Sequence, residues 1–68
     1  MSELRVRNDE LRTMREAMRQ LSQMIEELER GDVEKLVLTQ RNRMRAVVLS
    51  AERYSELERR LDGRPAPA

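Results

Sequence analysis

Residues 38–50 read LTQRNRMRAVVLS, and this stretch decides the fold. Two segments rich in Val and Leu, 35–40 and 43–49, flank the polar pair Arg41-Asn42. Because Asn tolerates positive φ, this pair predicts a tight turn and therefore an antiparallel β-hairpin. With a two-residue turn, the expected cross-strand pairs are Gln40 with Arg43, Leu38 with Arg45, and Leu36 with Val47.

This register predicts two apolar faces for the hairpin. The first face carries Leu36, Leu38, Val47 and Leu49, and the second carries Val37, Met44, Ala46 and Val48. A hairpin with one face in water alternates apolar and polar residues, so we expect both faces here to be covered. We expect the chain's own helix to cover one face. We expect a second copy of the chain to cover the other face. The expected dimer interface therefore consists of Val37, Met44, Ala46 and Val48.

Upstream of the hairpin, the sequence predicts a short strand followed by a long helix. Residues 3–7 alternate as a half-buried strand does, and Asn8 and Asp9 supply side-chain oxygens for a helix N-cap. We expect a helix from about residue 9 to residue 30, ended by Gly31, with a break near 13–15 as an alternative. Its apolar stripe consists of Leu11, Met14, Met18, Leu21, Ile25 and Leu28.

Downstream, Ser50 predicts the cap of a second helix, whose apolar stripe is Tyr54, Leu57 and Leu61. Gly63 ends that helix, and we expect residues 63–68 to form a disordered tail. The fold class predicted is α+β, with a short N-terminal strand, a long helix, an antiparallel β-hairpin and a C-terminal helix. Residues 1–62 then form one dimerisation and DNA-binding domain.

Composition narrows the function further. A chain of 68 residues without cysteine or histidine lacks the usual staples of small folds, so we expect it to be a homodimer. It offers no nucleophile–base pair, phosphate-binding glycine loop or metal-ligand set, which predicts no enzyme activity, no cofactor and no metal. No segment approaches the length of a membrane span and no signal peptide is evident, so we expect a cytoplasmic protein without membrane partners.

The charges are unevenly distributed although the net charge is only +1. Residues 26–34 carry five acids and one Arg, whereas residues 35–45 carry four basic groups and no acid. Of the 14 basic residues, 13 are Arg, and guanidinium groups suit bidentate contacts to phosphate and guanine. The predicted DNA-binding residues are Arg5, Arg7, Arg12, Arg15, Arg19, Arg41, Arg43 and Arg45.

Other interpretations of these residues stay open. The hairpin arginines also fit a solvated turn, and Arg12 also fits a surface ion pair with Glu16. Arg15 and Arg19, however, are spaced to repel each other on a helix, which contact with phosphate would offset. The methionines of the long helix fit either an adaptable binding surface or ordinary core.

The second half of the chain resembles the Phd/YefM family of bacterial antitoxins. In LVLTQRNRMRAVVLSAERYSELE the matching residues are Thr39, Ala46, Val47, Val48, Leu49, Ser50, Tyr54 and Leu57. AMRQLSQMIEELERG also looks like the family's first-half helix, and the match covers roughly residues 15–58. The sequence departs from the family pattern at the family's DNA-contacting positions: Met18 stands where the family commonly has Arg, and Gln40, Arg41 and Asn42 stand where it commonly has Arg and then a turn Gly.

The resemblance implies a homodimer that binds operator DNA to repress its own operon and that neutralises a toxin by direct binding. Family members usually continue well past the Tyr/Leu helix, whereas this sequence ends eleven residues after Leu57. We therefore expect Tyr54, Leu57 and Leu61 to bind the toxin, with another surface as the alternative. The alternative is a protein-interaction module, with helix- and hairpin-mediated dimerisation and partner binding, that does not bind DNA. A structural coiled-coil spacer is a further alternative.

Overall fold

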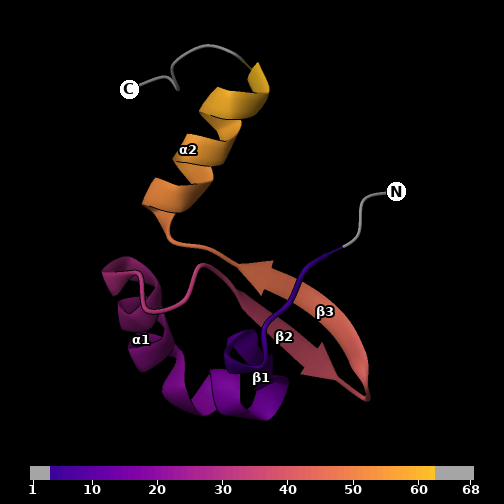
Figure 1. The fold of residues 1–68 in the computed structure, drawn as a ribbon. Coiled ribbons are helices and arrows are strands. Elements are labelled where there is room, and N and C mark those ends of the chain that lie inside the picture. The colour runs from indigo at the N-terminus through magenta and orange to yellow at the C-terminus, as the bar shows by residue number, and fades with distance from the viewer. Residues whose placement is uncertain (1–3, 63–68) are drawn as a thin grey trace.

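The computed structural model describes residues 4–62, so the expected tail over 63–68 lies outside the described residues. Within this range the chain is α+β, with two helices and a three-stranded sheet. Figure 1 shows the order of elements, which is a 3-10 turn η1 (Asn8–Glu10), β1 (Leu11–Thr13), α1 (Met14–Arg30), β2 (Leu36–Gln40), β3 (Arg43–Val48) and α2 (Ala51–Asp62). No helix among the described residues is both long and apolar enough to cross a membrane.

The N-terminal strand lies later in the chain than the sequence predicts. Residues 4–7 form no strand, and β1 covers Leu11–Thr13, inside the range expected to be helical. The helix begins late because Thr13 caps it: the Thr13 hydroxyl accepts from Glu16 N at 3.1 Å, and the Glu16 carboxylate accepts from Thr13 N at 2.9 Å. This reciprocal capping box fixes the helix start at Met14, which corrects the predicted caps Asn8 and Asp9.

The sheet has the strand order β1-β2-β3. β1 lies parallel to β2, with Leu11 opposite Val37 and Thr13 opposite Thr39, and β3 runs antiparallel to β2. The N-terminus of α1 therefore lies at the same end of the sheet as the hairpin turn.

The hairpin forms as predicted, but its register shifts beyond the turn. Gln40 pairs with Arg43 as expected, whereas Leu38 pairs with Ala46 and Leu36 with Val48. A bulge at Arg45 places an extra residue in β3, so the predicted pairs with Arg45 and Val47 are wrong. The shift exchanges the β3 residues beyond the bulge between the faces: one face carries Leu36, Leu38, Ala46 and Val48, and the other carries Val37, Thr39, Met44 and Val47.

The core lies between α1 and the first of these sheet faces. Its buried residues are Ala17, Met24, Leu28, Val33 and Leu36, with Leu38 and Val48 packed against them. Of the predicted helix stripe, Leu28 is buried, but Met18, Leu21 and Ile25 remain exposed. The helix is thus rotated from the expected orientation, and the small side chain of Ala17 lies against the sheet in place of Met18.

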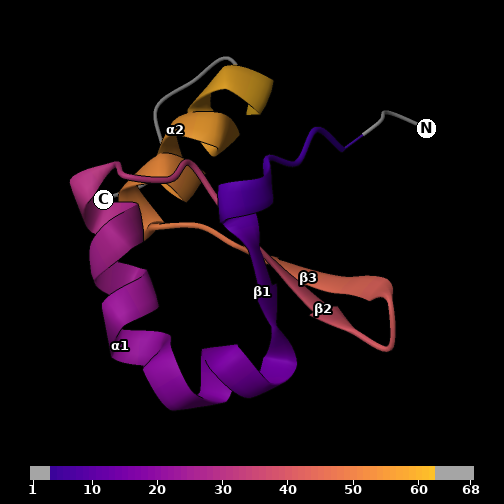
Figure 2. The ribbon, with the colours of Figure 1, turned by 60° about the horizontal axis from the view of Figure 1, so that its bottom comes forward.

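Helix α1 is bent and helix α2 stands away from the rest of the chain. The bend lies at Gln20, whose φ of −127° and ψ of 29° are not helical, and Figure 2 shows the two parts of α1 running in different directions. α2 begins after Ser50, whose hydroxyl accepts from Arg53 N at 3.1 Å, so the predicted cap is confirmed. From there α2 projects beyond the sheet (Figure 1).

Candidate nucleic-acid interface

The hairpin turn holds an arginine in an unfavourable backbone conformation. Arg41 has φ of 54° and Asn42 has φ of 61°, so both central residues of the turn are left-handed, as type I′ hairpins require. Asn accepts this conformation readily, but for other side chains it costs about 1–2 kcal/mol. Backbone strain that is retained at one residue is common at functional sites, so Arg41 is the first candidate for a functional residue.

A groove joins the turn to the start of α1. Its volume is about 430 Å³, and it is lined by Thr13, Met14, Arg15, Thr39, Gln40, Arg41 and Asn42. The two elements meet because β1 ends beside β2: Thr13 pairs with Thr39, whose hydroxyl also contacts Arg12 O at 3.4 Å. The positive end of the helix dipole of α1 also lies at this groove and adds to the charges of Arg15 and Arg41.

The carboxylate of Glu16 lies close to this groove, and it accepts hydrogen bonds from Thr13 as part of the helix cap. The pKa of Glu16 is lowered from its ordinary value chiefly because Thr13 N–H donates to it, followed by the Thr13 hydroxyl. Arg12 and Arg19 lower the pKa of Glu16 further by their charge. Among the described residues that line the groove none is acidic, so the groove favours anions.

The other hairpin arginines lie on the strand that leaves the turn. Arg43 is exposed and pairs with Gln40 across the hairpin. Arg45, at the bulge, is also exposed and donates to Gln40 Oε1 at 2.8 Å. Arg41, Arg43 and Arg45 therefore extend the positive surface of the groove along one end of the sheet. We call Arg15, Arg41, Arg43 and Arg45 the arginine tip.

Arg12 has a different role from the one the sequence predicts. Only 20% of its side chain is exposed, and its Nη2 forms an ion pair with Glu27 Oε1 at 3.0 Å. Its Nη1 also donates to Asp9 O at 2.7 Å and to Leu11 O at 3.0 Å. This guanidinium fastens the η1–β1 corner to α1, so it is engaged inside the protein and does not belong to the arginine tip.

The remaining predicted DNA-binding arginines lie outside the groove. Arg5 and Arg7 precede β1 and so come from the opposite end of the sheet, where the N-terminal segment leads away from the hairpin turn (Figure 1). Arg7 forms an exposed ion pair with Asp9 at 3.2 Å. Arg19 is exposed on α1, one turn after Arg15. The structure therefore brings together four of the predicted residues and separates the others.

A buried ion pair, which the sequence did not indicate, lies at the end of the sheet opposite the turn. Glu10 is 1% exposed, and its Oε1 accepts from Lys35 Nζ at 3.1 Å and from Arg7 N at 2.9 Å. The bond from Arg7 N–H is the main cause that lowers the pKa of Glu10; burial opposes it, and Lys35 supports it. The pair joins the residue before β1 to the residue before β2 and is structural. The described residues contain no cluster of three or more potential metal ligands.

The predicted dimer interface does not form one exposed face. Val37 is 0% exposed and Val48 packs against the core, while the exposed residues Met44 and Ala46 lie on opposite faces of the sheet. The bulge at Arg45 moves Ala46 and Val48 to the face that packs on α1, while Val37 and Met44 stay on the other face, so the four residues do not share one face.

The predicted toxin-binding residues lie on the projecting helix α2. Tyr54 and Leu61 are exposed, whereas Leu57 is half-buried. They leave an apolar surface on a helix that stands clear of the sheet, so they are accessible to a partner protein.

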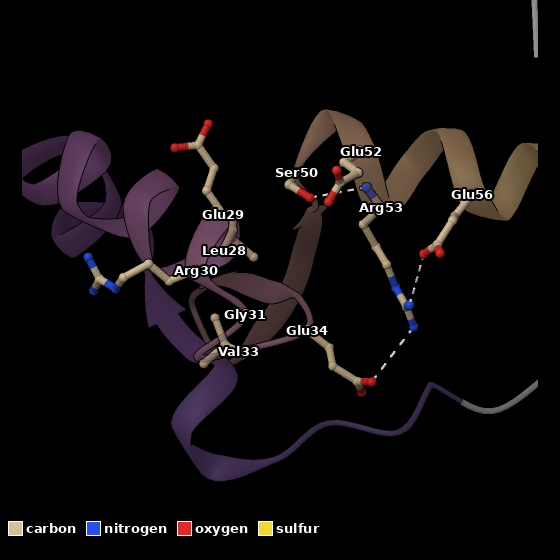
Figure 3. A pocket seen from close by; sticks show the side chains of 10 residues that line it. All are labelled: Leu28, Glu29, Arg30, Gly31, Val33, Glu34, Ser50, Glu52, Arg53 and Glu56. Atoms are coloured by element: carbon tan, nitrogen blue, oxygen red, sulfur yellow. Dashed lines mark hydrogen bonds and ion pairs between the residues drawn. The ribbon is translucent and has the colours of Figure 1, made fainter.

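A second cleft, of about 330 Å³, separates the end of α1 from the start of α2 (Figure 3). Its lining includes the acidic side chains Glu29, Glu34, Glu52 and Glu56. Arg53 reaches between two of them, at 3.7 Å from Glu34 and 3.4 Å from Glu56 (Figure 3). Arg30 and Arg53 also line this acidic cleft, but the acidic side chains outnumber them and the cleft lies apart from the arginine tip, so it is not part of the candidate interface.

Comparisons with protein-family models, with curated proteins and with solved structures found no match. The resemblance to the Phd/YefM family therefore rests on the residues quoted above, and a functional interpretation rests on the geometry of the arginine tip.

Proposed function

We propose that this chain is an antitoxin-like DNA-binding protein that acts as a homodimer, represses its own operon and neutralises a partner toxin. The observation that carries the proposal is the groove between the hairpin turn and the start of α1. There Arg15, in the first turn of α1, and Arg41, in the hairpin turn, line the same groove, and Arg41 is held in a costly conformation.

The arginine tip suits a nucleic-acid backbone. Each phosphate neutralised by an arginine releases condensed counterions, which is the main source of affinity for DNA. Guanidinium groups also bind phosphate or guanine through two parallel hydrogen bonds, which lysine cannot imitate. Because the turn projects these groups beyond the core, they reach a duplex without rearrangement of the sheet.

The toxin-binding part of the proposal rests on α2. Tyr54 and Leu61 are 55% and 85% exposed, and Leu57 lies on the same stripe. An apolar helix face of this kind binds a complementary groove on a partner. DNA binding and toxin binding would then use different ends of the chain.

The salt dependence of binding to duplex DNA tests the DNA-binding part of the proposal. Fluorescence anisotropy would follow binding of a labelled duplex taken from upstream of the gene, and of a shuffled duplex, between about 50 and 200 mM salt. If each protomer contacts two or three phosphates, a dimer gives a log–log slope of about −4 to −5. A flat slope, or no binding to either duplex, contradicts the proposal.

Paired charge reversals test the assignment to the tip. We expect Arg41→Glu with Arg43→Glu to abolish binding at the higher salt concentrations. The matched control is Arg59→Glu with Arg60→Glu, which changes the net charge equally on the last turn of α2. Equal loss of DNA binding in both double variants would mean that net charge alone, and not the arginine tip, is responsible.

The exposed apolar face of α2 also favours the second candidate, a protein-interaction module that does not bind DNA. Association with the product of the neighbouring gene discriminates between the two. If the tip variant loses DNA binding but still binds that protein, the antitoxin-like proposal stands. If the wild-type chain binds the protein and no DNA, the interaction module replaces it.

A further inference from the structure

Helix α1 carries an exposed apolar stripe beside its buried face. Met18, before the bend at Gln20, is 81% exposed; Leu21 and Ile25, after the bend, are 50% and 41% exposed and lie one turn apart on the same side of that part of the helix. Ala17, Met24 and Leu28, which contact the sheet, lie on the neighbouring side. α1 therefore has more apolar surface than its own sheet covers.

Charged residues along one edge of this stripe change sign from one end of the helix to the other. Before the bend at Gln20, Arg15 and Arg19 lie beside Met18, and after the bend, Glu26 and Glu29 lie beside Ile25. All four side chains are exposed. Two parallel copies of such a helix would place like charges together, whereas two antiparallel copies place arginines opposite glutamates.

We propose that the homodimer forms when the part of α1 before the bend packs antiparallel against the part of α1 after the bend in a second copy, around a twofold axis near Leu21 and Ser22. Met18 of one copy then lies beside Ile25 of the other, and Arg19 lies beside Glu26. This inference deepens the proposed function and rests on its homodimer, but it does not depend on DNA binding. It replaces the sheet face that the sequence predicted as the interface.

The self-complementary pattern is what selects a second copy as the occupant. A twofold interface presents the same patch from both sides, so each feature must find its complement within the same surface. The stripe with its edge of opposite charges satisfies this condition. The second face of the sheet also exposes Met44 and Val47, but Val37 between the strands is already covered and no comparable charge pattern accompanies it.

The arrangement also orients the two arginine tips. Each tip lies at the start of its own α1, so antiparallel pairing places the two tips at opposite ends of the paired helices. Two equivalent reading surfaces related by a twofold axis are the arrangement that palindromic half-sites require.

Disulfide cross-linking tests the axis directly, because the chain contains no cysteine. Ser22 is exposed beside the stripe, so Ser22→Cys should form an intermolecular disulfide under mild oxidation. Gln23→Cys is the matched control: Gln23 is also exposed, but it points away from the stripe, and it should remain largely uncross-linked. Equal cross-linking of both variants overturns the proposal.

Sedimentation experiments in the absence of DNA measure the strength of dimerisation. Leu21→Glu should give a monomer at concentrations where the wild type and Gln23→Glu are dimers, with far-UV circular dichroism showing that each variant is folded. Arg19→Glu and Glu26→Arg should each weaken dimerisation about tenfold, since each contact occurs twice across the axis. The double variant should recover the wild-type value, and a double variant weaker than either single one overturns the pairing.

The outcomes also separate this inference from the proposed function. A dimer that resists Leu21→Glu and cross-links through Met44→Cys uses the sheet face and overturns the α1 interface. A wild-type chain that is a folded monomer overturns both the α1 interface and the homodimer, even if it binds DNA. A dimer that cross-links at residue 22 but binds no DNA supports the α1 interface and contradicts the DNA-binding part alone.

Discussion

At the start of β1 and β2, Glu10 and Lys35 form a 3.1 Å ion pair in which the Glu10 side chain is 1% and the Lys35 side chain 18% exposed, whereas at the other end of the same strands Arg41 and Arg43 lie in solvent. Arg12 belongs with the first group, since Glu27 and two backbone carbonyls engage its guanidinium. Charged residues at one end of this small sheet therefore hold the fold together. At the other end they are available for an external anion, and counting charges along the sequence does not distinguish the two uses.

The largest effect should come from breaking the buried pair. Glu10→Ala leaves Lys35 without its carboxylate and removes the acceptor of Arg7 N–H, so we expect the free energy of unfolding to fall by about 3 kcal/mol. Urea denaturation followed by circular dichroism measures this loss. The neighbouring exposed residue provides the control, Asp9→Ala, which should change stability by less than about 1 kcal/mol. Similar losses in both variants would show that the buried pair is not special.

Arg12 and Arg15 provide the second comparison: Arg12 is engaged by Glu27, whereas Arg15, three residues further on, is exposed at the arginine tip. Arg12→Ala should lower stability by about 1–2 kcal/mol through its lost hydrogen bonds, with little change in DNA affinity of the folded protein. Arg15→Ala should lower DNA affinity and change stability by less than about 0.5 kcal/mol. Chemical denaturation and DNA titration of both variants check this; the opposite assignment of effects would contradict the comparison.

Removing the backbone strain at the turn should raise stability and at the same time weaken DNA binding. Replacing Arg41-Asn42 by Asn-Gly, the preferred type I′ pair, should raise the free energy of unfolding by about 1 kcal/mol and weaken DNA binding. Arg41→Lys retains the positive charge and the strain, so its stability should match that of the wild type. If the Asn-Gly variant is no more stable than the wild type, the positive φ of Arg41 carries no cost.

The smallest effect concerns acid titration at the two ends of the sheet. The pKa values of Glu10 and Glu16 are both lowered, each mainly by a backbone N–H bond. A lowered folded-state pKa stabilises the fold above the unfolded-state pKa, and this stabilisation is lost as the pH falls through the folded-state value. We therefore expect stability to be constant near neutrality and to decline in acid, less steeply in Glu16→Gln. NMR titration of the two carboxyl groups measures both values; ordinary values would contradict the hydrogen bonds.

Local signals predicted the elements whose causes are local. The Arg41-Asn42 turn and the Ser50 cap both form as the sequence indicates. Gly31 ends α1 with φ of 83°, in the left-handed conformation that glycine adopts at helix ends. The Thr13-x-x-Glu16 capping box was also readable, and it marks the true start of α1 better than Asn8 and Asp9 do.

The features that the sequence did not predict depend on distant partners or on a single inserted residue. β1 has only three residues, and it exists because β2 pairs with it. The bulge at Arg45 was hidden because both hairpin faces are apolar, so alternation does not fix the register. The contact of Arg12 with Glu27 spans 15 residues of sequence, so no helical spacing rule indicates it.

Helix α2 follows the sheet after Ser50 and contacts the loop before β2 through the exposed 3.7 Å pair of Arg53 and Glu34. The core residues and the arginine tip all precede Ser50. Substitutions along α2 can therefore accumulate with little consequence for folding. If α2 binds a partner protein, as proposed above, we expect the sequence after Ser50 to differ most between relatives that bind different partners.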